Sequence, residues 1–114
     1  MNFNITKVKI CVTIPEGYTD KIREAICEAG AGQIGTNYVE CSMTEKCIGT
    51  FRPVNNANPF IGEKNKLEFV NEDKLEVICE VDKVKEVIKV LREVHPYEEP
   101  AIDIYPLLDE SNFK

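Results

Sequence analysis

The sequence lacks the long apolar runs of a membrane protein and the basic clusters of a nucleic-acid-binding protein. No apolar stretch approaches the ~18 residues that a membrane-spanning helix needs, and the first residues hold no long apolar signal segment. Fourteen basic and 20 acidic residues give a formal net charge of −6, and the basic residues are scattered. Because nucleic-acid binding needs a basic face that neutralises phosphates, we expect a cytoplasmic protein with neither nucleic acid nor membrane as a partner.

The sequence is also poor in residues that carry catalysis. It has a single histidine, His95, and five cysteines that share no CxxC spacing. A dinuclear metal enzyme needs several histidine and carboxylate ligands, and a cysteine nucleophile needs a base that a third group orients. An acid–base pair of His95 and Glu98 is the one catalytic arrangement left, and no nucleophile or cofactor motif accompanies it. We therefore expect a protein that is not an enzyme, with its cysteines as free thiols in a reducing cytosol.

What is present is enough apolar sequence for one domain. Apolar residues make up 43% of the 114 positions, which suffices for a single core. The core should span about residues 7–108, and the polar tail at 109–114 is expected to fray. Valine and isoleucine alternate with other residues over 7–14, and a similar alternation covers 74–81. This period of two predicts a strand in each place, with one apolar face.

Two helices are predicted from apolar residues that recur at helical spacing. The first is expected to begin at Thr19, which can cap it, and to end before Gly30. The second should be capped by Asp82 and closed by Pro96, because the residue before a proline is pushed out of helical geometry. A last strand is expected at 101–105.

The middle of the chain is less regular. Residues 36–44 and 47–53 have strand character, which predicts a hairpin with its tip at 45–46. The following stretch, 53–65, is rich in proline, asparagine and glycine and is expected to be a loop, with a short returning strand at 67–69. We therefore predict an α+β fold, a ferredoxin-like βαββαβ sandwich with an extra hairpin and long loop excursion between the second and third core strands.

One face of the predicted sheet is left without helices. By the strand alternation this face carries Cys11 and Ile78, joined by Ala101, Asp103 and Tyr105 from the last strand. A half-apolar sheet face open to water is unusual for a monomer. Copies of the same chain would cover it, so we expect a homo-oligomer.

His95 opens the most distinctive stretch of the sequence, HPYEEP at 95–100. An imidazole beside the carboxylates of Glu98 and Glu99 can bind a divalent metal ion or serve as an acid–base group. Alternatively, His95 caps the second helix, where its donors suit the exposed carbonyls of the last turn. The sequence leaves both interpretations open.

Two loops of the chain are candidate binding segments. The glycine-rich loop at 30–35 follows a helix and enters a strand, which is the reverse of a phosphate-binding loop, so its glycines indicate close backbone packing. Residues 49–65 form a stretch too long to be a mere connection, and we expect it to contact a protein partner or cover a ligand. The candidate side chains for such a contact are Phe51, Arg52, Asn58 and Phe60.

Four stretches of the chain, at 15–23, 29–35, 49–53 and 95–100, resemble the YqfO-type domain and occur in the same order. That domain occurs inserted within dinuclear-metal proteins of the NGG-interacting-factor-three-like family and also as a stand-alone chain. More distantly, HPYEEPAIDIYPL resembles a motif of the CutA divalent-cation tolerance proteins, which are ferredoxin-like trimers similar in shape to PII signalling proteins.

The resemblance implies the fold, a homo-trimer and a divalent metal ion at His95. The domains that hold the two metals in the larger proteins are not in this sequence, so their activity is not expected here. Cys11 lies one residue out of register with a cysteine of CutA proteins and hence on the other sheet face, which disfavours a shared copper site. Two functions remain open: an oligomeric regulatory module that binds a small molecule or metal, and a copper- or zinc-binding tolerance protein that uses the HPYEEP motif.

Overall fold

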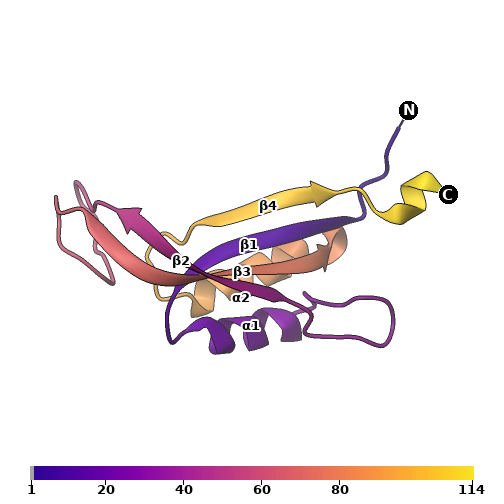
Figure 1. The fold of residues 1–114 in the computed structure, drawn as a ribbon, viewed down its shortest axis with the longest axis horizontal. Helices are drawn as coiled ribbons and strands as arrows, with labels where there is room; N and C mark the ends of the chain where they lie inside the picture. The colour runs from indigo at the N-terminus through magenta and orange to yellow at the C-terminus, as the bar shows by residue number, and fades with distance from the viewer. Residues whose placement is uncertain (1) are drawn as a thin grey trace.

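A four-stranded antiparallel sheet with two helices on one face makes up the fold (Figure 1). The computed structural model describes residues 2–114. The strands lie in the order β2-β3-β1-β4, and the two helices pack against each other. This order and the βαββαβ chain path are those of the predicted ferredoxin-like arrangement. The elements are β1 (Lys7–Pro15), α1 (Thr19–Glu28), β2 (Met43–Phe51), β3 (Glu68–Glu80), η1 (Val81–Lys83), α2 (Val84–Val94), β4 (Ile102–Leu107) and η2 (Glu110–Phe113).

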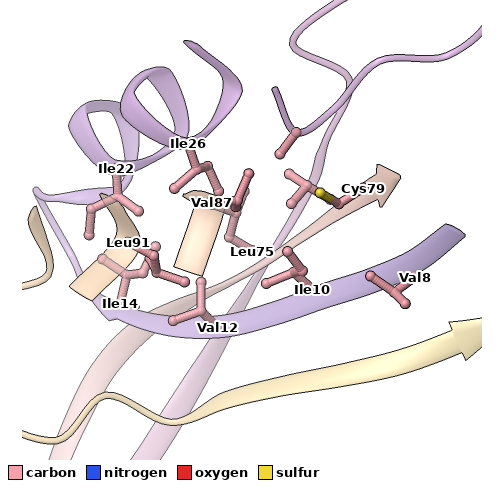
Figure 2. Close-up of a cluster of buried hydrophobic side chains, with 12 residues drawn as sticks. Val8, Ile10, Val12, Ile14, Ile22, Ile26, Leu75, Cys79, Val87 and Leu91 are labelled. Atoms are coloured by element: carbon pink, nitrogen blue, oxygen red, sulfur yellow. The ribbon is translucent and has the colours of Figure 1, made fainter. Parts of the chain in front are cut away.

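The core lies between the sheet and the helices, as the strand alternation predicts. Ile10 of β1 is fully buried and pairs with Val77 of β3, while Ile22 of α1 and Leu91 of α2 cover them from above the sheet (Figure 2). Replacing one such fully buried isoleucine or leucine by alanine typically costs about 2–5 kcal/mol of folding free energy. The buried apolar cluster consists of Val8, Ile10, Val12, Ile14, Ile22, Ile26, Ala31, Leu75, Val77, Cys79, Val87 and Leu91.

The predicted hairpin with its tip at 45–46 is wrong, because β2 runs straight through these two residues. Glu45 pairs with Lys74 of β3, and Lys46 pairs with Asp73, with 2.7 Å between Lys46 Nζ and Asp73 Oδ1. Opposite charges across two strands stabilise the pairing, so the polar pair sits inside a strand rather than at a turn. Residues 36–42 contribute only an isolated bridge between Ile34 and Tyr38.

The third strand is longer than the sequence indicates. The stretches predicted at 67–69 and 74–81 belong to one strand, β3, which pairs with β2 over residues 68–76 and with β1 over residues 72–80. The reversal between β2 and β3 is the long loop at 52–67. The excursion between the second and third strands is therefore this loop at the tip of one long hairpin.

Both predicted helix caps require correction. The residue before α1 is Tyr18, and the hydroxyl of Thr19 instead donates to Asp73 Oδ2 at 2.6 Å, across to β3. Asp82 lies inside the 3-10 turn η1, and α2 begins two residues later at Val84 without a side-chain cap. The hydroxyl of Thr19 is used by the buried carboxylate of Asp73 on a distant strand, and a capping rule based on local sequence cannot include that contact.

The glycine-rich loop serves close packing, in agreement with the sequence. Gly32 has a φ of 79°, and its amide donates to the Ile78 carbonyl at 2.7 Å. A Cβ at this position would lie 2.9 Å from the backbone oxygen of Cys41. Only glycine both adopts this positive φ without strain and leaves enough space for the neighbouring backbone.

The two ends of the described chain lie side by side (Figure 1). The amide of Asn4 donates to Asn112 Oδ1 at 2.9 Å, and the rings of Phe3 and Phe113 are 5.7 Å apart. The tail was expected to fray, but Glu110–Phe113 forms the 3-10 helix η2 that these contacts hold. The prediction rested on the polar composition of the tail and did not include the contacts of Asn112 and Phe113 that attach it.

The sheet face opposite the helices carries the side chains that the alternation placed there. The strand register puts Cys11, Ile78, Asp103 and Tyr105 on this face, with Ala101 just before β4. Tyr105 is 53% exposed, and among residues 2–114 both helices lie on the other face of the sheet (Figure 1). No helix in the described part of the chain is long and apolar enough to cross a membrane.

Candidate functional site

A cavity of about 380 Å³ lies at the end of the sheet where β1 and β2 stop and β3 starts. The loop at 52–67 closes it from one side, and the HPYEEP stretch closes it from the other. The structure thus brings together two segments that the sequence singled out separately. Its lining consists of Thr13, Thr50, Phe51, Arg52, Pro53, Val54, Ala57, Pro59, Phe60, Ile61, Glu72, Tyr97, Glu98, Glu99 and Ala101.

Aromatic rings form much of the cavity wall. The ring of Tyr97 lies between those of Phe51 and Phe60, with centroid separations of 6.2 Å and 6.4 Å. Tyr18 meets Phe60 edge-on at 5.6 Å and holds it from outside. Such tilted and edge-on pairs are favourable arrangements for aromatic side chains. They fix the loop against the HPYEEP stretch.

A buried carboxylate stands beside these rings. Glu72 of β3 is 5% exposed, and its Oε2 accepts a hydrogen bond from the Tyr97 hydroxyl at 2.6 Å. Burial, with the hydrogen bond to Glu72, raises the pKa of Tyr97 well above its usual value, so the phenol stays protonated and donates. Gly49 of β2 provides the space, because a methyl group there would overlap Oε1 of Glu72.

His95 lies beneath the cavity wall, with both ring nitrogens in use. It is 6% exposed; its Nδ1 accepts from the amide of Tyr97 at 3.1 Å, so Nε2–H donates to the Thr13 carbonyl at 2.8 Å. Burial lowers the pKa of His95, which favours this neutral ring. His95 is the C-cap residue of α2, but its ring joins the helix end to β1 and positions Tyr97 instead of binding the helix carbonyls.

The other candidate residues line the cavity, except Asn58, which is hydrogen-bonded to one of the lining residues. Glu98 Oε1 accepts from the amide of Asn58 at 3.0 Å, which joins the loop to the HPYEEP stretch. Nη1 of Arg52 donates to the Asn65 carbonyl at 2.7 Å, within the loop. Glu99 is exposed and lines the cavity. Phe51 and Phe60 lie in its aromatic wall.

A metal ion does not fit these side chains within one copy of the chain. Among residues 2–114, no group of three or more His, Cys, Asp or Glu side chains is placed to hold one. His95, the residue that the resemblance proposes as a ligand, has no free nitrogen lone pair. Metal binding at His95 therefore stays a prediction without support from this geometry.

Sequence reasoning missed the roles of Glu72, Gly49 and Thr13. The sequence contained no sign of a role for Glu72, because the strand alternation places it on the sheet face without helices, where a glutamate is ordinarily solvated. Its burial depends on Tyr97, 25 positions away, and on the empty space at Gly49. The presence of glycine inside a strand was the one available sign, since it often marks the close approach of another group.

Fold and cavity together define a ferredoxin-like α+β module with a ligand-sized cavity at one sheet end. No protein-family model matches the chain. It is 47% identical over 102 residues to the GTP cyclohydrolase 1 type 2 homolog of Halalkalibacterium halodurans, covering 90% of this chain and 27% of that protein. It is 43% identical over 99 residues to the Bacillus subtilis protein of the same name, covering 87% and 26%. The chain thus spans about a quarter of the length of these relatives.

Solved structures show the same fold. A Bacillus cereus protein related to NIF3 superposes with a TM-score of 0.76 at 36% identity, covering 93% of this chain and 27% of that one. CutA from Synechococcus elongatus gives 0.69 at 14% identity, covering 94% and 81%. The resemblance to the YqfO-type domain is therefore confirmed, and the likeness to CutA proteins is one of fold.

Proposed function

We propose that this protein is a regulatory module that binds a small molecule in the cavity between the loop at 52–67 and the HPYEEP stretch. The observation that carries the proposal is the cavity itself. Its volume of about 380 Å³ lies within the range of roughly 300–1,000 Å³ that is typical of ligand sites. Its lining is mainly apolar and aromatic, with a few polar groups, which is the usual composition of such sites.

The loop supports a regulatory role, because an occupant would touch both segments that close the cavity. Few contacts now join them: the Asn58–Glu98 hydrogen bond and the packing of Phe60 on Tyr97. A bound molecule adds contacts to both sides and so stabilises the closed arrangement. The change in loop order would be the signal to a partner that contacts residues 49–65.

The proposal is one of binding and not of catalysis. The described cysteines are all free thiols, and burial raises the pKa of Cys11, Cys27, Cys47 and Cys79, which opposes the reactive thiolate form. We also propose a cytoplasmic homo-oligomer, a trimer by the CutA resemblance, in which copies cover the sheet face around Tyr105. The exposed apolar residues on that face support it.

The experiment is a titration of the ¹⁵N-labelled chain with small-molecule fragments, monitored by two-dimensional NMR. Binders are expected to shift amides of cavity residues, including Thr13, Thr50 and Ala101. Phe60→Ala should weaken binding about tenfold or more, because Phe60 forms part of the wall. Phe69→Ala is the control, since Phe69 is also an exposed phenylalanine but lies outside the cavity lining. Fragments that shift only residues elsewhere, or equal affinities for both variants, would contradict the proposal.

The alternative function is copper or zinc binding through the HPYEEP motif. Only the resemblance supports it, and one CutA of this fold is described as a periplasmic divalent cation tolerance protein. Titration of Cu²⁺ and Zn²⁺ into the intact protein, followed by calorimetry, tests it. From the engaged nitrogens of His95 we expect no stoichiometric site per copy, and a tight site that His95→Gln removes would restore this alternative.

A further inference from the structure

We propose that the cavity selects an organic cation, namely a small molecule that presents an ammonium or similar group on an apolar body. This inference rests on the proposed function and names the chemical class of its ligand. It follows from three features that meet at one place: an aromatic wall, a buried carboxylate without a cationic partner, and a lining with more negative than positive groups.

The aromatic wall provides faces for a cation. Phe51, Phe60 and Tyr97 all line the cavity, and Tyr97 is about equally far from the other two rings. The face of an aromatic ring carries negative potential, and a cation within about 6 Å of its centre is attracted. Several rings around one space form the arrangement that recognises quaternary and primary ammonium groups. Their apolar surface also accommodates the body of the ligand.

Glu72 supplies the charge that such a ligand would neutralise. Its carboxylate lines the cavity although the residue is 5% exposed, and in the described chain it forms no salt bridge. Oε2 accepts the Tyr97 hydroxyl, and Oε1 has no hydrogen-bond donor among residues 2–114. Oε1 is not among the buried atoms that lack a partner, so it remains accessible, and a cation in the cavity that Glu72 lines can reach it. An ammonium group in the cavity would provide both the positive charge and a hydrogen-bond donor.

Among the remaining charged residues of the lining, carboxylates outnumber the one cationic residue. Glu98 and Glu99 stand at the cavity beside Glu72, and Arg52 is its single cationic residue. The guanidinium of Arg52 is turned to the Asn65 carbonyl, so it does not neutralise Glu72. With the chain at a net charge of −6, a cation is attracted to this end of the sheet and an anion is repelled.

Three probes of similar size and different charge test the inference: benzylamine, benzyl alcohol and phenylacetate. Dissociation constants are measured from amide shifts of cavity residues in the intact wild-type chain. We expect benzylamine to bind at least tenfold more tightly than benzyl alcohol, and phenylacetate to bind most weakly. Raising the salt concentration should reduce the advantage of benzylamine, because the attraction is electrostatic.

Two variants locate the charge that gives the preference. Glu72→Gln keeps an acceptor for the Tyr97 hydroxyl and should lower benzylamine affinity to about that of benzyl alcohol. Glu45→Gln removes the same charge from an exposed position outside the cavity and should change neither affinity. Equal binding of the three probes, or preference for phenylacetate, would overturn the cation inference while the cavity remained a binding site. If no probe shifted any cavity residue, the proposed function would fail as well.

Discussion

Gly49→Ala is the substitution whose effect on folding stability depends most directly on the buried carboxylate of Glu72. Inside a strand, alanine is ordinarily more stable than glycine by about 0.5–1 kcal/mol, because glycine loses more conformational freedom on folding. Here the added methyl group would overlap Oε1 of Glu72. The carboxylate must move, and it then loses the hydrogen bond from Tyr97. A hydrogen bond to a charged group contributes about 1.5–3 kcal/mol, so we expect a net destabilisation of about 1–2 kcal/mol.

A double-mutant cycle in urea separates this cause from general crowding. The free energies of unfolding of wild type, Gly49→Ala, Tyr97→Phe and the double variant are compared. In the Tyr97→Phe background the carboxylate has no hydroxyl to lose, so alanine should cost about 1.5–3 kcal/mol less there, the full contribution of the hydrogen bond. An alanine variant as stable as wild type, or one with equal cost in both backgrounds, would refute the reasoning about Glu72.

Three further predictions concern pH, backbone packing and assembly. Burial lowers the pKa of His95 below its ordinary 6.5, so the unfolded chain binds the proton more readily than the folded chain as the pH falls below about 6.5. The free energy of unfolding in urea should therefore decrease from pH 7 toward the folded-state pKa, and His95→Asn should remove this decrease. Gly32→Ala should cost at least about 1 kcal/mol more than Gly17→Ala in thermal unfolding, because both have positive φ but only Gly32 meets a backbone oxygen, that of Cys41. Tyr105→Glu should shift the protein toward monomer in sedimentation velocity, and a wild-type chain that is already monomeric at micromolar concentration would contradict the homo-oligomer.

The regular half of the fold could be predicted because its signals are local. The alternation at Val8, Ile10 and Val12 and the helical spacing around Leu91 are short-range patterns that burial then confirms. The middle could not be predicted in the same way. Glu45 belongs to a strand because Lys74 lies opposite it, and that pairing spans almost thirty residues of intervening chain.

The candidate site was predictable in its segments but not in its centre. Phe51, Phe60 and Glu98 were singled out from loop length and motif, and all three line one cavity. His95 looked like a ligand because a single histidine beside carboxylates is conspicuous, yet its ring faces inward to Thr13. The roles of Glu72 and Tyr97 required the strand register and the fold of the loop, which no local pattern contains.

The contact between Asn4 and Asn112 has a consequence for proteins in which such a unit is only one part. A polypeptide that entered the unit at Asn4 would emerge beside the point of entry, so the unit could be spliced into a surface loop of a host without separating the host's own elements. The relatives, of which this chain matches about a quarter, are large enough to contain such a host. In that setting the loop between β2 and β3, which closes the cavity, would lie at the far end of the sheet from the graft point (Figure 1), free to accept or release an occupant while the host stays folded.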